Sequence, residues 1–410
     1  MPKNTNIIVG LEIGTSKICT AVGEVDERGA VAIIGLGQSR SDGVRKGEIV
    51  DFERAADAIR VALAEAEQTS NVEIRSVYLG VSGAHIQAFT SHGFHPIPTA
   101  DRQITEEDVQ EVLRNAKTVN LPEGNIVIHA IRQNFSVDGN ADVRNPVGLL
   151  GRKLEVDVLV VHGMQTRLQN PIKLLKEELL LNVEHTVFNG IAASLATLDA
   201  EQKELGTLVI DLGGGTTDYV AVVDGLIKHC GVIAVGGDHI SNDLAVGLKV
   251  PLGRAEKLKT EYGSAIVPNE VKGKFISIQN ELGLPAKNIN LENLHLIMSA
   301  RLEELFEIIY HDLEEHGILD DLRGGIVICG GGARIPRITE LAERIFQLPT
   351  VVGTPKGFGG ISSSLNKPEF ATALGLIKFG CFRKKTTSKN SGFKELIRSA
   401  ISGIFPMRNQ

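Results

Sequence analysis

The sequence predicts an α/β protein made of two similar lobes that face each other across a cleft. The main observation is a repeat: residues 7–25 and 206–220 each read as an apolar strand ending in an acidic residue, a glycine turn with hydroxyl side chains, and a second β-rich run. Both copies continue through a third β-like run into a helical pattern, at residues 51–68 and 238–248. A repeat of about half the chain favours two lobes over a solenoid.

The turn of the second copy predicts half of a site for a magnesium-bound nucleotide. Asp211 ends its strand, and Gly213–Gly215 follow. Glycine lets a backbone approach a ligand closely, and successive N–H groups can line an anion-binding hollow. The hydroxyl groups of Thr216 and Thr217 add donors, and an acid beside bound phosphate requires a cation such as Mg²⁺. Taken alone, this turn is equally typical of a tight hairpin.

The first copy favours the nucleotide interpretation, because it repeats the same chemistry. Glu12 stands at the end of its strand, and Gly14–Lys17 supply a glycine, two hydroxyl groups and a lysine. Two such turns facing each other would hold one nucleotide, and closing the cleft between them would be a hinge motion. We expect Glu12 and Asp211 to hold Mg²⁺ through water molecules.

Composition narrows the class of protein. The 410 residues are 42% hydrophobic and 23% charged, which is ordinary for a soluble protein with two or three domains. A net charge of −7 argues against nucleic acid as the main partner. The four cysteines form no CxxC motif, as expected in a reducing cytosol without structural zinc. Neither a signal peptide nor a run of about 18 apolar residues is evident.

Over residues 1–82, the pattern predicts a first lobe with the element order β-β-β-α-β. A separate module is predicted over residues 83–163. In the module we expect a proline-containing loop at residues 91–100 and a helix opened by the capping pattern at Thr105. Two strands should follow it, at residues 126–137 and 154–161. Helices are predicted at residues 165–181 and 190–198, the latter rich in small residues.

The second lobe is expected to carry two further ligand-facing segments. A glycine–acid turn at residues 235–242 enters a helix, whose N-terminus suits an anion. Glu256 and Lys259 share one face of the next short helix. A third glycine run follows the strand at residues 326–329. Residues 264–300 are expected to be irregular, whereas helices are predicted at residues 298–311 and 371–379 and a loop at residues 353–368.

The C-terminal tail combines a predicted flexible linker with a predicted amphipathic helix. The linker, residues 382–392, is basic and polar. The helix over residues 393–405 places aromatic and aliphatic residues on one face and basic residues on the other, which suits an interfacial membrane helix. The alternative is a helix docked on protein. The proposed membrane contacts are Phe393, Leu396, Ile397, Ile401, Ile404 and Phe405, with Lys394 and Arg398 beside them.

These motifs resemble the ATP-binding elements of the actin/Hsp70/sugar-kinase superfamily. Glu12–Lys17 matches its first phosphate motif, Asp211–Asp218 its second, and Gly330–Arg334 its adenosine motif. Within that superfamily the chain resembles, over nearly its whole length, the FtsA family of bacterial cell-division proteins. The specific signs are RNPVGLLG at residues 144–151 and the amphipathic tail. The chain departs from the superfamily at Glu12, where Asp is common.

The resemblance implies an actin-like (ribonuclease H-like) two-lobed fold that binds ATP and Mg²⁺, with an inserted α+β module and a C-terminal amphipathic helix. It divides the chain into a first lobe (1–82, 164–205 and the return helix 369–381), an SHS2-like module (83–163), a second lobe (206–242 and 326–368) and its outer part (243–325). Besides the metal-holding Glu12 and Asp211, it implies nucleotide contacts at Gly14, Thr15, Ser16, Lys17, Gly213, Gly214, Gly215, Thr216, Thr217, Gly236, Gly237, Glu256, Lys259, Gly331, Gly332, Ala333 and Arg334.

By the same resemblance, the protein would form actin-like filaments on the cytoplasmic face of the bacterial inner membrane at the division site, as a peripheral protein. Its second lobe would bind the C-terminal tail of the tubulin-like GTPase FtsZ, and the 83–163 module would recruit later division proteins. Two alternatives stay open: an actin-like adaptor of another membrane machine such as a type IV pilus, and a sugar-kinase-like phosphotransferase. No catalytic base is evident, so we expect at most a slow ATPase.

Overall fold

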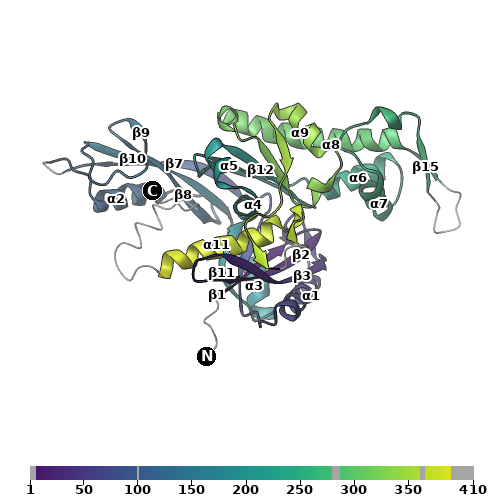
Figure 1. Cartoon of the computed structure of the whole chain (residues 1–410), viewed down its shortest axis with the longest axis horizontal. Coiled ribbons are helices and arrows are strands. Elements are labelled where there is room, and N and C mark those ends of the chain that lie inside the picture. Colours follow the sequence, from purple (N-terminus) through teal and green to yellow (C-terminus); the bar gives the residue numbers. More distant parts are fainter. Residues whose placement is uncertain (1–5, 99–100, 279–286, 361–364, 389–410) are drawn as a thin grey trace.

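The computed structural model describes residues 6–98, 101–278, 287–360 and 365–388 (Figure 1). The sheet of the first lobe has the order β11-β6-β1-β2-β3-β19. β1, β2 and β3 form an antiparallel meander. β6 pairs in parallel with β1, and β11 pairs in parallel with β6. The strands are β1 (Asn6–Ile13), β2 (Lys17–Val25), β3 (Val31–Arg40), β6 (Ser76–Val81), β11 (Asn182–Phe188) and the short β19 (Gly359–Gly360).

The sheet of the second lobe repeats this topology. Its order is β14-β13-β12-β17-β18, with β12, β13 and β14 antiparallel and β17 parallel beside β12. β12 therefore corresponds to β1 and β17 to β6, and the prediction of two similar lobes is confirmed. The strands are β12 (Thr207–Leu212), β13 (Thr217–Val223), β14 (Leu226–Ile233), β17 (Ile326–Cys329) and β18 (Thr350–Val352).

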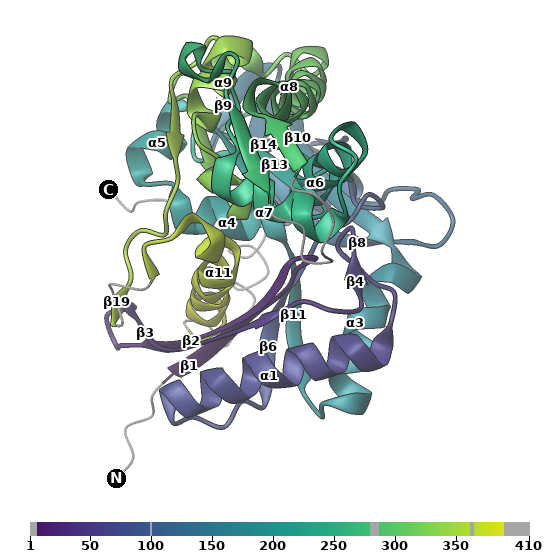
Figure 2. The same cartoon turned by 90° about the vertical axis from the view of Figure 1, so that its right-hand side faces the viewer.

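Two helices, α4 (Asn189–Thr197) and α11 (Ala371–Ser388), lie between the two sheets (Figure 2). Their backbones touch where they cross: a Cβ on Gly375 would lie 1.7 Å from the carbonyl oxygen of Ala192. Only glycine fits there, which explains the small-residue composition of both helices. On the other face of the first sheet lies α1 (Phe52–Ser70), capped by the Asp51 side chain.

The inserted module forms one end of the molecule (Figure 1) and has its own apolar core. One helix packs on a four-stranded sheet of order β7-β10-β8-β9. The expectation of a loop at residues 91–100 was wrong for residues 91–96, because β7 pairs residue by residue with β10 as far as Pro96. The elements are β7 (Gln87–Pro96), α2 (Glu106–Lys117), β8 (Asn125–Val137), β9 (Asn140–Val143) and β10 (Lys153–Met164).

The outer part of the second lobe carries the other end of the molecule, where β15 lies (Figure 1). The expectation that residues 264–300 are irregular was wrong in part: β15 and β16 form a hairpin, and α8 begins at Leu291. The side chain of Asn290 caps this helix by accepting from the N–H groups of Glu292 and Asn293. The elements are α6 (Gly237–Gly247), α7 (Leu252–Tyr262), β15 (Phe275–Ile278), β16 (Lys287–Asn290) and α8 (Leu291–Glu315).

The remaining described elements complete the fold. They are β4 (Val44–Arg45), β5 (Glu48–Ile49), α3 (Gln165–Glu178), α5 (Ala200–Leu205), α9 (Ile338–Phe346), and the 3₁₀ turns η1 (Asn269–Val271), η2 (Leu319–Asp321), η3 (Gly331–Arg334) and η4 (Pro368–Phe370).

The expectation of a flexible linker over residues 382–392 was wrong for residues 382–388. α11 continues to Ser388, so residues 382–388 are helical where a flexible linker was predicted. The Nζ of Lys384 still contacts the first lobe, donating to the carbonyl oxygen of Ile7. The predicted membrane helix, residues 393–405, lies outside the described residues. Over the ranges that the structure covers, no helix is both long and apolar enough to cross a membrane.

Candidate functional site

A cavity of about 1000 Å³ lies where the two lobes meet. Its walls are the β1–β2 turn, the β12–β13 turn, the start of α6, one face of α7 and the η3 turn. A volume at the upper end of the range for small-molecule sites accommodates a large ligand. The repeat therefore brings the two predicted glycine turns to one place.

The first turn is closed by its own backbone. The N–H of Gly14 donates to the carbonyl oxygen of Lys17 at 3.0 Å, and a Cβ at Gly14 would lie 2.7 Å from that oxygen. The Nζ of Lys17 folds back onto the carboxylate of Glu12 at 2.6 Å. Burial disfavours the charged form of Lys17, but the attraction of the Glu12 carboxylate outweighs the effect of burial. The pKa of Lys17 is therefore raised. A fixed positive charge thus lies at the floor of the cavity.

The second turn is built in the same way and touches the first. The N–H of Gly213 donates to the carbonyl oxygen of Thr216 at 2.9 Å. A Cβ on Gly214 would lie 2.9 Å from the Cβ of Ser16, and one on Gly215 would lie 2.5 Å from the hydroxyl of Thr15. Side chains at these positions would force the two turns apart, so glycine is required for the close approach of the lobes.

Three carboxylates line the cavity and interact electrostatically: Glu12, Asp211 and Asp218. Burial, reinforced by the charge of Glu12, raises the pKa of Asp211 to about 6, against a hydrogen bond that Thr372 of α11 donates to it at 2.6 Å. Burial and the charge of Asp211 raise the pKa of Asp218 well above its ordinary value. A divalent cation would relieve this repulsion, so the carboxylates fit the expected Mg²⁺.

Sequence reasoning missed Asp218 and Ser82 as site residues. The Ser82 hydroxyl donates to Asp218 at 2.6 Å and lies 3.1 Å from that of Thr216. Asp218 stood inside the recognised motif, so its role was open to prediction. Ser82 follows β6 of the other lobe and reaches this place only through the fold.

The side chain of Asn189, at the start of α4, is a second missed feature. It lines the cavity, and its Oδ1 is buried without a hydrogen-bond partner. A buried acceptor of this kind normally has a partner. This oxygen packs against Gly80 of β6, where an added Cβ would lie 2.4 Å from it, so it stays an unsatisfied acceptor behind the cavity wall.

The far wall comes from the second lobe. The start of α6 is tied to the second turn, because Gly237 N–H donates to Gly213 and Asp238 N–H donates to Gly214, at 3.0 and 2.8 Å. The Nζ of Lys259 donates to the carbonyl of Gly237 at 2.9 Å and pairs with Glu256 at 2.7 Å. α7 therefore presents both predicted side chains to the cavity.

The third glycine turn, η3, closes the remaining side. Gly330, just before it, has a φ of +80°, a conformation that glycine adopts without strain. The guanidinium of Arg334 pairs with Glu369 at 2.6 Å, and both line the cavity. Gly331 faces open space, since a Cβ there would meet no atom within 4 Å. A flat group could lie against this turn.

The cavity collects most of the predicted residues but not all. Three do not line it. The hydroxyl of Thr217 points away and donates to the carbonyl of Val235 at 2.8 Å. Gly236 packs against the backbone of Gly213 and Gly214, and Ala333 is buried in the second lobe. The predicted residues on the wall are Glu12, Gly14, Thr15, Ser16, Lys17, Asp211, Gly213, Gly214, Gly215, Thr216, Gly237, Glu256, Lys259, Gly331, Gly332 and Arg334.

Comparison with known sequences gives matches over nearly the whole chain. A family model described as "Cell division protein FtsA" matches residues 208–375, and one described as "SHS2 domain inserted in FTSA" matches residues 83–162. Among curated proteins, "Cell division protein FtsA" of Borreliella burgdorferi is 36% identical over 98% of this chain and 98% of its own length. The protein of the same description from Escherichia coli K12 is 32% identical, over 91% and 90%.

Solved structures give a similar fold at low identity. The "PilM-PilN type IV pilus biogenesis complex" aligns with a TM-score of 0.66 and 18% identity over 91% of this chain and 98% of that one. MreB5 of Spiroplasma citri bound to ADP aligns with a TM-score of 0.53 and 17% identity over 94% and 99%. At such identities the likeness shows the fold alone, and that fold is the actin-like one expected from the sequence.

Proposed function

Since the chain belongs to the FtsA family of cell-division proteins, we propose that it is an ATP-dependent scaffold that polymerises on the cytoplasmic membrane and tethers FtsZ to it. The observation that carries the proposal is the cavity lined by two glycine turns, two buried carboxylates (Asp211 and Asp218), the half-buried Glu12 and a lysine. MreB5, a structural neighbour, is bound to ADP in one structure and to AMPPNP in another. ATP with Mg²⁺ is accordingly the ligand that we propose here.

Each wall of the cavity has a distinct part in this proposal. The N–H groups and hydroxyls of residues 14–16 and 213–216 would bind phosphate oxygens, and Lys17 would add positive charge. Lys259 and Arg334 would flank the nucleoside from the second lobe. Mg²⁺, held by Glu12 and Asp211, would neutralise phosphate charge. Because these groups come from both lobes, the bound ligand favours the closed arrangement.

The site supports binding better than rapid turnover. A general base must be deprotonated near neutral pH to accept a proton from water. Burial raises the pKa of Asp218 well above its ordinary value, and one of its oxygens already accepts a hydrogen bond from Ser82, so this group is not a free carboxylate placed to activate water. We therefore propose slow ATP hydrolysis, with nucleotide state acting mainly on lobe closure.

ATP binding should depend on pH through Asp211. Its pKa of about 6 means that the metal-binding carboxylate is present above pH 6 and lost below it. We expect the affinity for Mg-ATP to fall about tenfold for each pH unit below 6. Calorimetric titrations at pH 5 and 7.5 test this, with the affinity of Mg²⁺ for free ATP measured in the same buffers and subtracted. An unchanged affinity would exclude Asp211 from the metal site.

The membrane tether is proposed to lie in the tail. If residues 393–405 form a helix, their sequence places apolar residues on one face beside basic residues, and a helix of that kind binds anionic lipid surfaces. We expect the full chain to float with anionic liposomes in the presence of ATP and a chain lacking residues 393–410 to remain at the bottom of the gradient. Equal flotation of the two chains would remove the tether from the proposal.

A matched pair of charge substitutions tests whether the proposed apolar face itself binds the membrane, which removal of the whole tail does not show. Ile401→Glu places a charge on the proposed apolar face and should abolish flotation. Ser402→Glu adds the same charge on the opposite face and should leave most of it, because only the electrostatic contribution of about 1 kcal/mol is lost.

The choice of partner is the remaining part of the proposal. The second lobe would bind the C-terminal tail of FtsZ, the chain would bind copies of itself, and the inserted module would bind later division proteins. The fold likeness to a type IV pilus component keeps a pilus adaptor as the alternative. Capture of a synthetic FtsZ tail peptide by the full chain supports the first assignment, and capture of pilus proteins instead would replace it.

A further inference from the structure

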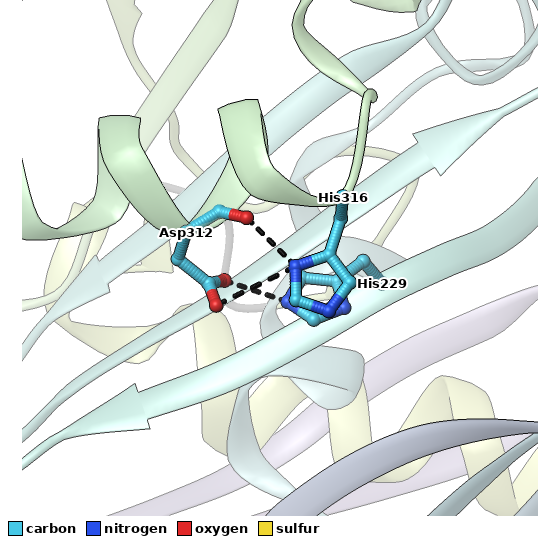
Figure 3. A group of neighbouring side chains, drawn as sticks. All are labelled: His229, Asp312 and His316. Carbon is cyan, nitrogen blue, oxygen red and sulfur yellow. Dashed lines mark hydrogen bonds and ion pairs between the residues drawn. The ribbon is translucent and has the colours of Figure 1, made fainter.

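Three side chains with metal-binding chemistry meet in the second lobe, away from the cavity: His229, Asp312 and His316 (Figure 3). His229 lies on β14, whereas Asp312 and His316 lie at the C-terminal end of α8 and just after it. One ligand atom of each lies within 4.8 Å of the other two. The fold thus brings together residues that are 83 positions apart.

The three groups already face one another. The Nε2 of His229 lies 2.6 Å from one carboxylate oxygen of Asp312, and the Nδ1 of His316 lies 3.6 Å from the other. The two imidazole rings stack with centroids 4.0 Å apart (Figure 3). Asp312 and His316 are four residues apart, so they lie on the same side of the helix end. The three groups are therefore already close together, apart from the orientation of the His316 ring.

A fourth residue fixes the carboxylate. The hydroxyl of Tyr219, a buried residue on β13, donates to Asp312 at 2.7 Å. Hydrogen bonds of this kind to a ligating carboxylate hold it in orientation and raise metal affinity. His229 is also buried, whereas His316 is 47% exposed. The cluster therefore has a rigid inner side and an accessible outer side.

We propose that His229, Asp312 and His316 bind a divalent transition-metal ion, with Zn²⁺ preferred. Two imidazoles and one carboxylate are a typical three-residue set for zinc and leave a fourth position for water. Mg²⁺ prefers oxygen ligands alone, so the ion of the cavity should not compete here. The ring of His316, whose Nδ1 donates to the carbonyl of Asp312 at 2.7 Å, turns on binding to present its lone pair.

The ion would hold α8 and β14 together. α8 carries the outer part of the second lobe, and its far end would be tied to β14 of the central sheet. β14 is in turn bonded to the inserted module, because the side chain of Gln133 donates to the carbonyl of Ile227 at 2.9 Å. Zinc would accordingly stabilise the second lobe without touching the cavity.

The test is zinc binding by the full chain in a buffer with excess Mg²⁺, followed by equilibrium dialysis and metal analysis. We expect one tightly held Zn²⁺ per chain and a higher melting temperature with Zn²⁺ than with a chelator. His316→Ala, at an exposed position, should weaken that binding at least tenfold and abolish the temperature shift. Tyr219→Phe should weaken it by about tenfold or more while keeping all three ligands.

His311→Ala is the matched control, because His311 lies on the same helix, is exposed and lies outside the cluster, where its Nδ1 pairs with Glu314 at 3.3 Å. It should bind zinc as the wild type does. Binding that survives in both His316→Ala and His229→Ala, or that is absent from the wild type, overturns the proposal. Either result leaves ATP binding untested by this experiment, so the two proposals fail separately.

Discussion

Replacing Gly375 by alanine is expected to destabilise the protein by about 3 kcal/mol, although alanine is the better helix former. The added Cβ would lie 1.7 Å from the carbonyl oxygen of Ala192, so α4 and α11 would have to separate. Both helices lie between the two sheets, and close-packed interiors absorb such shifts poorly. Thermal unfolding of the purified variant measures the effect.

Gly253→Ala provides the matched control. Gly253 also lies in a helix, α7, but a Cβ there meets nothing within 4 Å. Stability should remain unchanged or rise slightly, by the helix preference of alanine. If the two variants melted at the same temperature, the contact between α4 and α11 would not be the tight crossing described here.

Replacing Asp211 by asparagine is expected to have opposite effects on the protein with and without nucleotide. With Mg-ATP, one of the two proposed metal-holding carboxylates is lost, and affinity should fall by roughly 10²-fold or more. Without nucleotide, a carboxylate that burial and Glu12 disfavour is removed. The nucleotide-free variant should therefore be more stable than the wild type at neutral pH.

The sign of the second effect follows from the pKa. Asp211 titrates near pH 6 in the folded protein, against an ordinary 3.8, so the folded state binds its proton more tightly than the unfolded state does. Stability contributed by this group is present at low pH and lost as pH rises from about 4 to 6. Two pKa units correspond to about 3 kcal/mol at most, which Asp211→Asn should recover at pH 7.5 but not at pH 4.

Scanning calorimetry at the two pH values, with and without Mg-ATP, separates these contributions. Glu65→Gln is a suitable control, because Glu65 lines the same cavity but lies on α1 and is not one of the proposed metal-holding carboxylates. A nucleotide-free Asp211→Asn protein that melts below the wild type at pH 7.5 would contradict the assignment of a strained carboxylate.

The repeat explains why so much of the fold followed from the sequence. Glycine turns after short apolar strands mark the ends of β1 and β12, and each strand is followed by its neighbour along the chain. Strands that pair with their neighbour along the chain leave a pattern that can be recognised within a short stretch of sequence. β7 left none, because the residues of β10 that pair with it lie 57 to 75 positions further along the chain, and because its sequence contains polar residues and a proline. The start of α8 was missed because its cap, Asn290, is also the last residue of β16, a short strand of weak β character.

Some residues of the candidate site were likewise predictable from the sequence, and others were not. Residues in the two turns were predictable, because their type and spacing reflect direct chemical requirements. Ser82 and Asn189 were not, because they follow β6 and β11 and reach the cavity only after the sheet has formed. Thr217 was assigned to the site from its neighbours, but strand alternation turns its side chain to the opposite face of β13 from Thr216. His229, Asp312 and His316 meet only through the packing of α8 on the sheet.

The most direct test of the central claim is a crystal structure of the full chain with Mg²⁺ and a non-hydrolysable ATP analogue. We expect the triphosphate to lie between the Gly14–Lys17 and Gly213–Thr216 turns, with the ion beside Glu12 and Asp211. A cavity that stays empty at saturating analogue, or a nucleotide bound elsewhere on the protein, would contradict that claim.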